Sequence, residues 1–119
     1  MLQLTPHHKI YLATQHIDFR KGLDKITGVC REQLSLNPFV GDLFVFTNRK
    51  HTALKILVYD GQGFWLCMKR LSKGKFTWWP KPGAHTCTLS CAELSILIYN
   101  GNPKAAQLSG DWRPLLTDD

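Results

Sequence analysis

Apolar and polar positions in the first third of the chain follow two different periods. Residues 9–14 alternate and are rich in β-forming side chains, which predicts a first strand. After a polar connection, apolar residues recur at spacings of three and four, at Leu23, Ile26, Cys30 and Leu34. This period predicts an amphipathic helix over roughly residues 23–36. We expect it to end at Asn37-Pro38, because the residue before a proline avoids the helical region.

The middle of the chain has the pattern of successive strands with short turns between them. Four runs rich in apolar, β-branched and aromatic side chains are predicted strands: residues 43–47, 54–59, 64–71 and 76–79. Asp60-Gly61 accepts the positive φ of a tight hairpin turn, and Pro80 stops the last run. Consecutive strands joined in this way predict an antiparallel meander.

A second helix is expected over residues 90–99. Ser90 and Glu93 have the spacing of a capping box, and the residues that follow are almost all apolar, so the helix should be buried against the sheet. The sequence therefore predicts an α+β fold, with an antiparallel four- to five-stranded meander sheet and two helices packed on it. A chain of 119 residues fits one domain, which we expect over residues 1–103, with a C-terminal arm or tail over residues 104–119.

Positive charge is concentrated in one third of the chain. Residues 49–81 hold eight basic residues and one acid, a net charge of +7, whereas the other 86 residues carry a net charge of −1. Such concentration suits a polyanion such as nucleic acid, because phosphate binding releases counterions. A solvated basic face that aids solubility is the alternative.

Catalytic and metal-binding patterns are absent from the sequence. It contains no phosphate-binding glycine loop, nucleophile elbow or zinc-protease motif, so we expect no cofactor and no catalytic residue. Asp18, Asp60 and Glu93 are the best carboxylates for a metal-dependent nuclease, but each has a structural explanation. The four cysteines lack the two close ligand pairs of a zinc site and are expected to be reduced structural thiols, so no metal is expected either. With no membrane-spanning run and no signal peptide in the sequence, we expect a cytoplasmic location and no membrane partner.

Aromatic residues lie among the basic residues, which is typical of nucleic-acid binding. A sheet face carrying Lys55, Tyr59, Trp65, Lys69 and Trp78 or Trp79 would offer cations to phosphates and flat rings to bases. The alternative is that these rings cover the core, with lysines at its rim. The candidate nucleic-acid-binding residues are Arg20, Lys21, Arg49, Lys50, Lys55, Trp65, Lys69, Arg70, Lys73, Lys75 and Trp78.

The sequence also resembles a known family through an ordered set of motifs. These are Thr14-x-His16-x-Asp18-Phe19-Arg20-Lys21-Gly22, Phe39-x-Gly41-x-Leu43-Phe44-Val45-Phe46, Lys55-Ile56-Leu57-Val58-Tyr59-Asp60-Gly61-Gln62-Gly63 and Lys69-Arg70-Leu71-x-x-Gly74-x-Phe76-x-Trp78, with one extra residue before Pro80. Together they resemble the TnpB accessory protein of IS-sixty-six-type bacterial insertion sequences over about residues 8–99. The resemblance implies a role in DNA transposition beside a separate transposase that holds the catalytic carboxylates, and no enzymatic activity of its own. It also places Arg20 and Lys21 in a family motif.

Two functions agree with these observations. The first is a non-catalytic transposition accessory protein that contacts DNA, at the ends of the element, through the basic segment. The second is an adaptor that binds the transposase of the same element without direct DNA contact, its charge acting only on the encounter rate.

Overall fold

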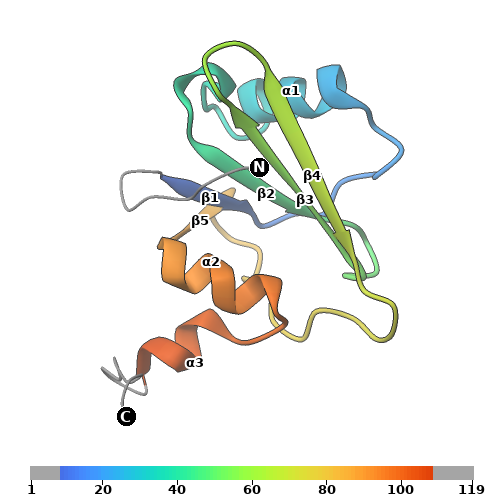
Figure 1. Ribbon diagram of the computed structural model, residues 1–119, viewed down its shortest axis with the longest axis vertical. Helices are drawn as coiled ribbons and strands as arrows, with labels where there is room; N and C mark the ends of the chain where they lie inside the picture. Colours follow the sequence, from blue (N-terminus) through green and yellow to red (C-terminus); the bar gives the residue numbers. More distant parts are fainter. Residues whose placement is uncertain (1–8, 109–119) are drawn as a thin grey trace.

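The computed structural model describes residues 9–108, which form five strands, three α-helices and one short 3-10 helix (Figure 1). In chain order the elements are β1 (Ile10–Ala13), α1 (Leu23–Glu32), η1 (Pro38–Val40), β2 (Leu43–Thr47), β3 (Ala53–Tyr59), β4 (Phe64–Arg70), β5 (Thr86–Leu89), α2 (Cys91–Ile98) and α3 (Pro103–Leu108). The α+β class is confirmed. None of the helices among these residues is long and apolar enough to span a membrane.

The sheet is mixed, so the predicted antiparallel meander is wrong in its topology. The strand order is β4-β3-β2-β1-β5. β1 and β2 are parallel, with Ile10 opposite Leu43, and the other three pairs are antiparallel. The physical reason is the connection through α1, since two parallel neighbours need a long crossover between them. Only β2, β3 and β4 form the predicted meander.

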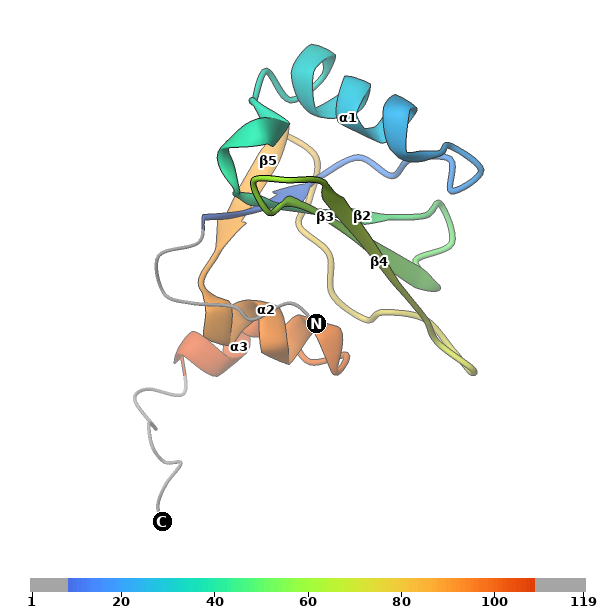
Figure 2. The same ribbon diagram turned by 45° about the horizontal axis from the view of Figure 1, so that its top comes forward.

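Each face of the sheet is covered by a different part of the chain. Figure 2 shows α1 on one side of the sheet and α2 with α3 on the other. The core under α1 contains Ile26, Val29, Cys30, Phe44, Phe46 and Leu57. The core under α2 contains Ile10, Leu12, Leu43, Val45, Leu54, Leu94 and Leu97. The two-helix prediction therefore holds for α1 and α2, and α3 is an additional helix.

The predicted helix over residues 23–36 ends early. α1 stops at Glu32, and Leu36 N donates to Cys30 O at 2.9 Å to close a turn in which Ser35 has a left-handed φ of 56°. The apolar spacing continues past the helix because Leu34 packs against the same core from the turn.

The predicted strand over residues 76–79 is wrong. These residues lie in the long connection between β4 and β5, where Phe76 is only 2% exposed and Trp78 and Trp79 pack against the core under α2. The rings are used for packing, and Thr77 N donates to the side chain of Asn100 at 2.9 Å instead of to a neighbouring strand. The fifth strand is instead β5, which pairs antiparallel with β1.

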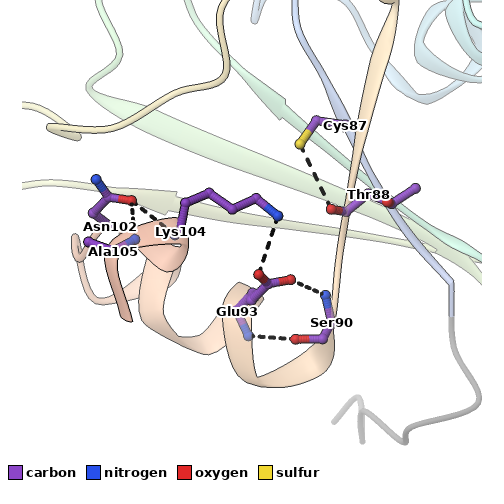
Figure 3. Close-up of polar contacts among 7 residues, drawn as sticks. All are labelled: Cys87, Thr88, Ser90, Glu93, Asn102, Lys104 and Ala105. Atoms are coloured by element: carbon purple, nitrogen blue, oxygen red, sulfur yellow. Dashed lines mark hydrogen bonds and ion pairs between the residues drawn. The ribbon is translucent and has the colours of Figure 1, made fainter. Parts of the chain in front are cut away.

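The capping box that begins α2 is confirmed. Ser90 Oγ accepts a hydrogen bond from Glu93 N at 3.1 Å, and Glu93 Oε1 accepts one from Ser90 N at 2.8 Å (Figure 3). The second carboxylate oxygen of Glu93 accepts from Lys104 Nζ at 3.3 Å, which ties α3 to α2. The first residues of the predicted C-terminal arm thus form α3, and residues 109–119 lie outside the described part of the chain.

Candidate nucleic-acid interface

Two loops meet at one end of the sheet. The β2–β3 loop (residues 48–52) is ordered by Asn48, whose Oδ1 accepts a hydrogen bond from Thr52 N at 2.8 Å. The segment after β4 lies along this loop, because Leu71 N donates to Thr52 O at 2.9 Å and Phe76 N donates to His51 O at 2.7 Å. Both loops lie at the same end of the molecule (Figure 1).

This end of the sheet carries five exposed cations, which we call the basic end: Arg49, Lys50, Arg70, Lys73 and Lys75. Within residues 9–108 the ion pairs are Arg20 with Asp18 and Lys104 with Glu93, so none of the five is neutralised by an ion pair there. The positive potential also reaches His51. Burial, followed by the charges of Lys75 and His16, lowers the pKa of His51 below its ordinary value.

The carboxylates of the hairpin region lie at the opposite end. Asp42 precedes β2 and Asp60 follows β3, and these two strands are antiparallel. Asp60 Oδ1 accepts from Gly63 N at 2.8 Å and from Gln62 N at 2.9 Å, and Oδ2 accepts from Trp65 Nε1 at 2.8 Å. These hydrogen bonds lower the pKa of Asp60, and the bond from the Gly63 N–H has the largest effect. They confirm its turn role, and they leave the basic end without a facing carboxylate from this hairpin.

Arg20 and Lys21 lie in a separate loop before α1. Arg20 is exposed, and its guanidinium pairs with Asp18 at 2.7 Å, with Nε donating to both carboxylate oxygens at 3.1 Å. The hydrogen bond from the Arg20 side chain, followed in size by the one from its backbone amide, lowers the pKa of Asp18 to about 2. Asp18 thus pairs with Arg20 and does not cap α1, whose N-cap is Gly22.

Lys55 is turned inward under this loop. It is 9% exposed, and its Nζ donates to Phe19 O at 2.8 Å and lies 4.9 Å from the centre of the Phe19 ring. A weaker bond to Lys21 O spans 3.5 Å. Lys55 therefore holds the loop that carries Arg20 and Lys21 to the sheet.

Lys69 and Trp78 are also engaged in contacts within the domain, whereas Trp65 is exposed. Lys69 Nζ donates to Ile98 O at 2.6 Å and lies 4.9 Å from the Tyr99 ring centre, which places a cation at the C-terminal end of α2. Trp65 is 44% exposed, whereas Trp78 is half-buried against the core under α2.

The expected basic–aromatic face does not form. β3 and β4 pair with Tyr59 opposite Phe64 and with Val58 opposite Trp65. Lys55 and Tyr59 consequently lie on the α1 face, whereas Trp65 and Lys69 lie on the α2 face. Of the candidate residues, the structure brings together the loop cations and Arg70, and it places Lys55, Lys69 and the tryptophans elsewhere.

The sequence did not lead us to expect that Lys55 holds the loop before α1, or that Lys69 binds the end of α2. The signal for Lys55 was present, because a lysine inside the apolar run of a central strand must find a buried acceptor. The contact between Lys69 and the end of α2 joins residues 29 positions apart, and no local pattern indicates it.

Among residues 9–108, no three His, Cys, Asp or Glu side chains group in a way that could hold a metal ion. Cys30 lies on the buried side of α1, and burial raises the pKa of its thiol to about 12.

Comparison with known proteins identifies the family. The family model for IS66 Orf2-like proteins matches residues 8–107, and the chain belongs to this family. The chain is 37% identical over 114 residues to "Uncharacterized protein y4hO" of Sinorhizobium fredii, covering 96% of each chain. It is 36% identical over 91 residues to "Uncharacterized protein y4jC" of the same organism, covering 76% of each chain. No solved structure matches.

The family places the chain among transposition-associated accessory proteins of IS66-type insertion sequences. The resemblance seen in the sequence motifs is thereby confirmed, and the matched region extends beyond Tyr99 into α3.

Proposed function

We propose that the protein acts in transposition by contacting the phosphate backbone of DNA through the basic end. The observation that carries the proposal is the segregation of charge along the β2–β3–β4 hairpins. Five exposed cations extend from one end, and Asp42 and Asp60 lie at the other. Lysine and arginine side chains on ordered loops can reach successive phosphates, and each phosphate contact releases a counterion.

Arg20 adds a further cation beside the N-terminus of α1, on the loop held by Lys55. Because Asp18 already pairs with Arg20, we assign the larger part of the binding energy to the basic end and a supporting role to this loop. The ends of the insertion sequence are the proposed DNA sites.

A second candidate function is supported by a separate surface. Phe39 and Val40 are 45% and 60% exposed, and Phe39 packs edge-on against Tyr59 and Phe64 with ring centres 5.1 Å apart. Exposed apolar side chains on a rigid aromatic base are typical of protein interfaces. The candidate partner for this surface is the transposase of the same element.

The test is fluorescence anisotropy with labelled duplex DNA, using element-end and scrambled sequences over a salt series. Changing Lys73 and Lys75 to glutamine should weaken binding to both duplexes and make the slope of log affinity against log salt shallower by about 2. The matched control changes Lys9 and Lys25, which are exposed lysines outside the basic end, and it should leave the slope unchanged.

Equal losses in the two double variants, or no binding at low salt, would contradict the phosphate-contact proposal. In that case a pull-down of the transposase, with Phe39→Ser as the variant, decides whether the second surface carries the function.

A further inference from the structure

Along its whole length, the outer edge of β4 has no partner strand in the described part of the chain. β4 is the end strand of the sheet and pairs only with β3 among the described residues. The bond from Leu71 N to Thr52 O fixes which residues face β3, so Trp65, Cys67 and Lys69 bond to that strand. The backbone N–H and C=O groups that point outward belong to Phe64, Leu66, Met68 and Arg70.

Proteins usually protect such an edge, because it can pair with another strand. Here the strand is seven residues long, lacks proline, and carries two exposed apolar side chains, Trp65 at 44% and Met68 at 49%. These features indicate a pairing surface.

We propose that the edge of β4 binds β4 of a second copy of this chain in antiparallel orientation, centred on Cys67. In this register the outward-facing residues meet one another: Phe64 pairs with Arg70 of the second copy, and Leu66 pairs with Met68 of the second copy. Each pair exchanges two backbone hydrogen bonds. All seven residues of β4 take part, and the two sheets become one.

Side chains in this register are complementary. Leu66 and Met68 place apolar groups side by side across the new interface, on the α1 face. On the same face Phe64 lies opposite an arginine, which is a favourable aromatic–cation pair. On the other face Trp65 lies opposite Lys69, whose ammonium group keeps its bond to Ile98 O. Cys67 lies opposite the same residue of the second copy.

Charge also selects the antiparallel orientation. The turn that contains Asp60 lies beyond the start of β4, and the loop that contains Lys73 and Lys75 lies beyond its end. Antiparallel pairing brings Asp60 of one copy beside these lysines of the other. Parallel pairing would instead bring the two basic ends together, and like charges would repel.

The dimer would place its two basic ends at opposite ends of the shared edge. The two Arg70 residues are then six positions apart along the ladder, or about 20 Å at roughly 3.4 Å per residue. The inference concerns protein self-association and is tested without DNA, so its failure and that of the proposed DNA contact are distinguishable.

Cys67 provides a direct test in the folded protein. Residues opposite each other in a non-hydrogen-bonded antiparallel pair have Cα atoms about 4.5 Å apart, within the range of a disulfide. Treatment of the Cys87→Ser, Cys91→Ser variant with diamide, which takes up the two electrons and two protons of the thiols, should give a covalent dimer. Adding Cys67→Ser should abolish it.

Sedimentation of the reduced protein is the second measurement. The wild-type chain should show a monomer–dimer equilibrium. Met68→Pro should raise the dimer dissociation constant at least about tenfold, because proline lacks the N–H that Met68 donates across the interface, and the bond is lost in both copies. Met68→Ala is the matched control, since it shortens the side chain and keeps the N–H, and its dimer should be retained.

A wild-type chain that stays monomeric at all concentrations, or a cross-link that persists without Cys67, would overturn the proposal. If Met68→Pro fails to fold, judged by its circular dichroism melt, the Cys67 cross-link decides alone.

Discussion

Replacing Lys55 by methionine should loosen the loop before α1 and lower the stability of the domain. The change removes a charged hydrogen bond of 2.8 Å to Phe19 O and a cation–ring contact of 4.9 Å, while the methionine keeps most of the side-chain volume. A hydrogen bond to a charged group contributes about 1.5–3 kcal/mol, and the cation–ring contact adds roughly 1 kcal/mol. Burying the ammonium group has a cost that offsets part of this gain. We therefore expect the free energy of unfolding to fall by about 1–2 kcal/mol.

Two assays separate the local effect from the global one. Urea unfolding should report the loss of stability, and a thermal melt should shift downward by roughly 5–10 °C for a domain of this size. Amide hydrogen exchange should accelerate in residues 18–22, because their tether to β3 is lost. The matched control is Lys50→Met, which removes an exposed cation and should change stability by less than about 0.5 kcal/mol.

The result that would refute this reasoning is a Lys55→Met protein as stable as the wild type, with unchanged exchange in the loop. It would mean that the cost of burying the ammonium group equals everything its contacts contribute. On the proposed function, Lys50→Met should instead weaken DNA binding directly, so the two substitutions should separate stability from binding.

Three further predictions concern the helix cap, an exposed ion pair and a buried thiol. Ser90→Ala should lower the free energy of unfolding by about 1 kcal/mol in urea titrations, because the Glu93 N–H loses its acceptor, and an unchanged midpoint would contradict the cap. Arg20→Ala should raise the pKa of Asp18 from about 2 toward its ordinary 3.8 in a carbon NMR titration. Since the folded pKa is the lower one, the stabilising contribution of this pair is present above pH 3.8 and is lost as the pH falls toward 2. Cys30 has a thiol pKa of about 12 and should therefore react with a thiol reagent at pH 8 only on unfolding. Mass spectrometry of the peptides locates the label. Labelling of Cys30 in the folded protein would show that the core under α1 opens.

Local sequence patterns predicted which strands and helices form better than they predicted which strands pair. β2, β3 and β4 and both long helices follow from side-chain periodicity and turn residues, with errors at the ends. The parallel β1–β2 pair and the short β5 depend on contacts between distant segments, such as Ile10 with Leu89. Trp78 and Trp79 have strand-forming side chains, but tertiary packing decides their conformation.

The candidate site could be predicted in part. A short polar loop has nothing that can bury a cation, and the candidates Arg49, Lys50, Lys73 and Lys75 in such loops are exposed. The prediction that Lys55 and Trp65 share a face of the sheet was wrong, and the length of the hairpin loop could have shown this. A four-residue hairpin loop pairs Tyr59 with Phe64, which sets odd positions of one strand beside even positions of the next.

The position of β1 between β2 and β5 has a consequence for how the chain is made. β1 emerges from the ribosome before the other strands of the sheet, whereas β5, which covers its outer side, and α2, which covers the core under α2, follow much later, with Leu89 and Leu94. Until then, the growing chain exposes the apolar α2 face of a sheet with two open edges, a combination that promotes aggregation. A ribosome that stalls before residue 86 would therefore leave a chain prone to aggregate, so translation of the last quarter of the chain is what protects it.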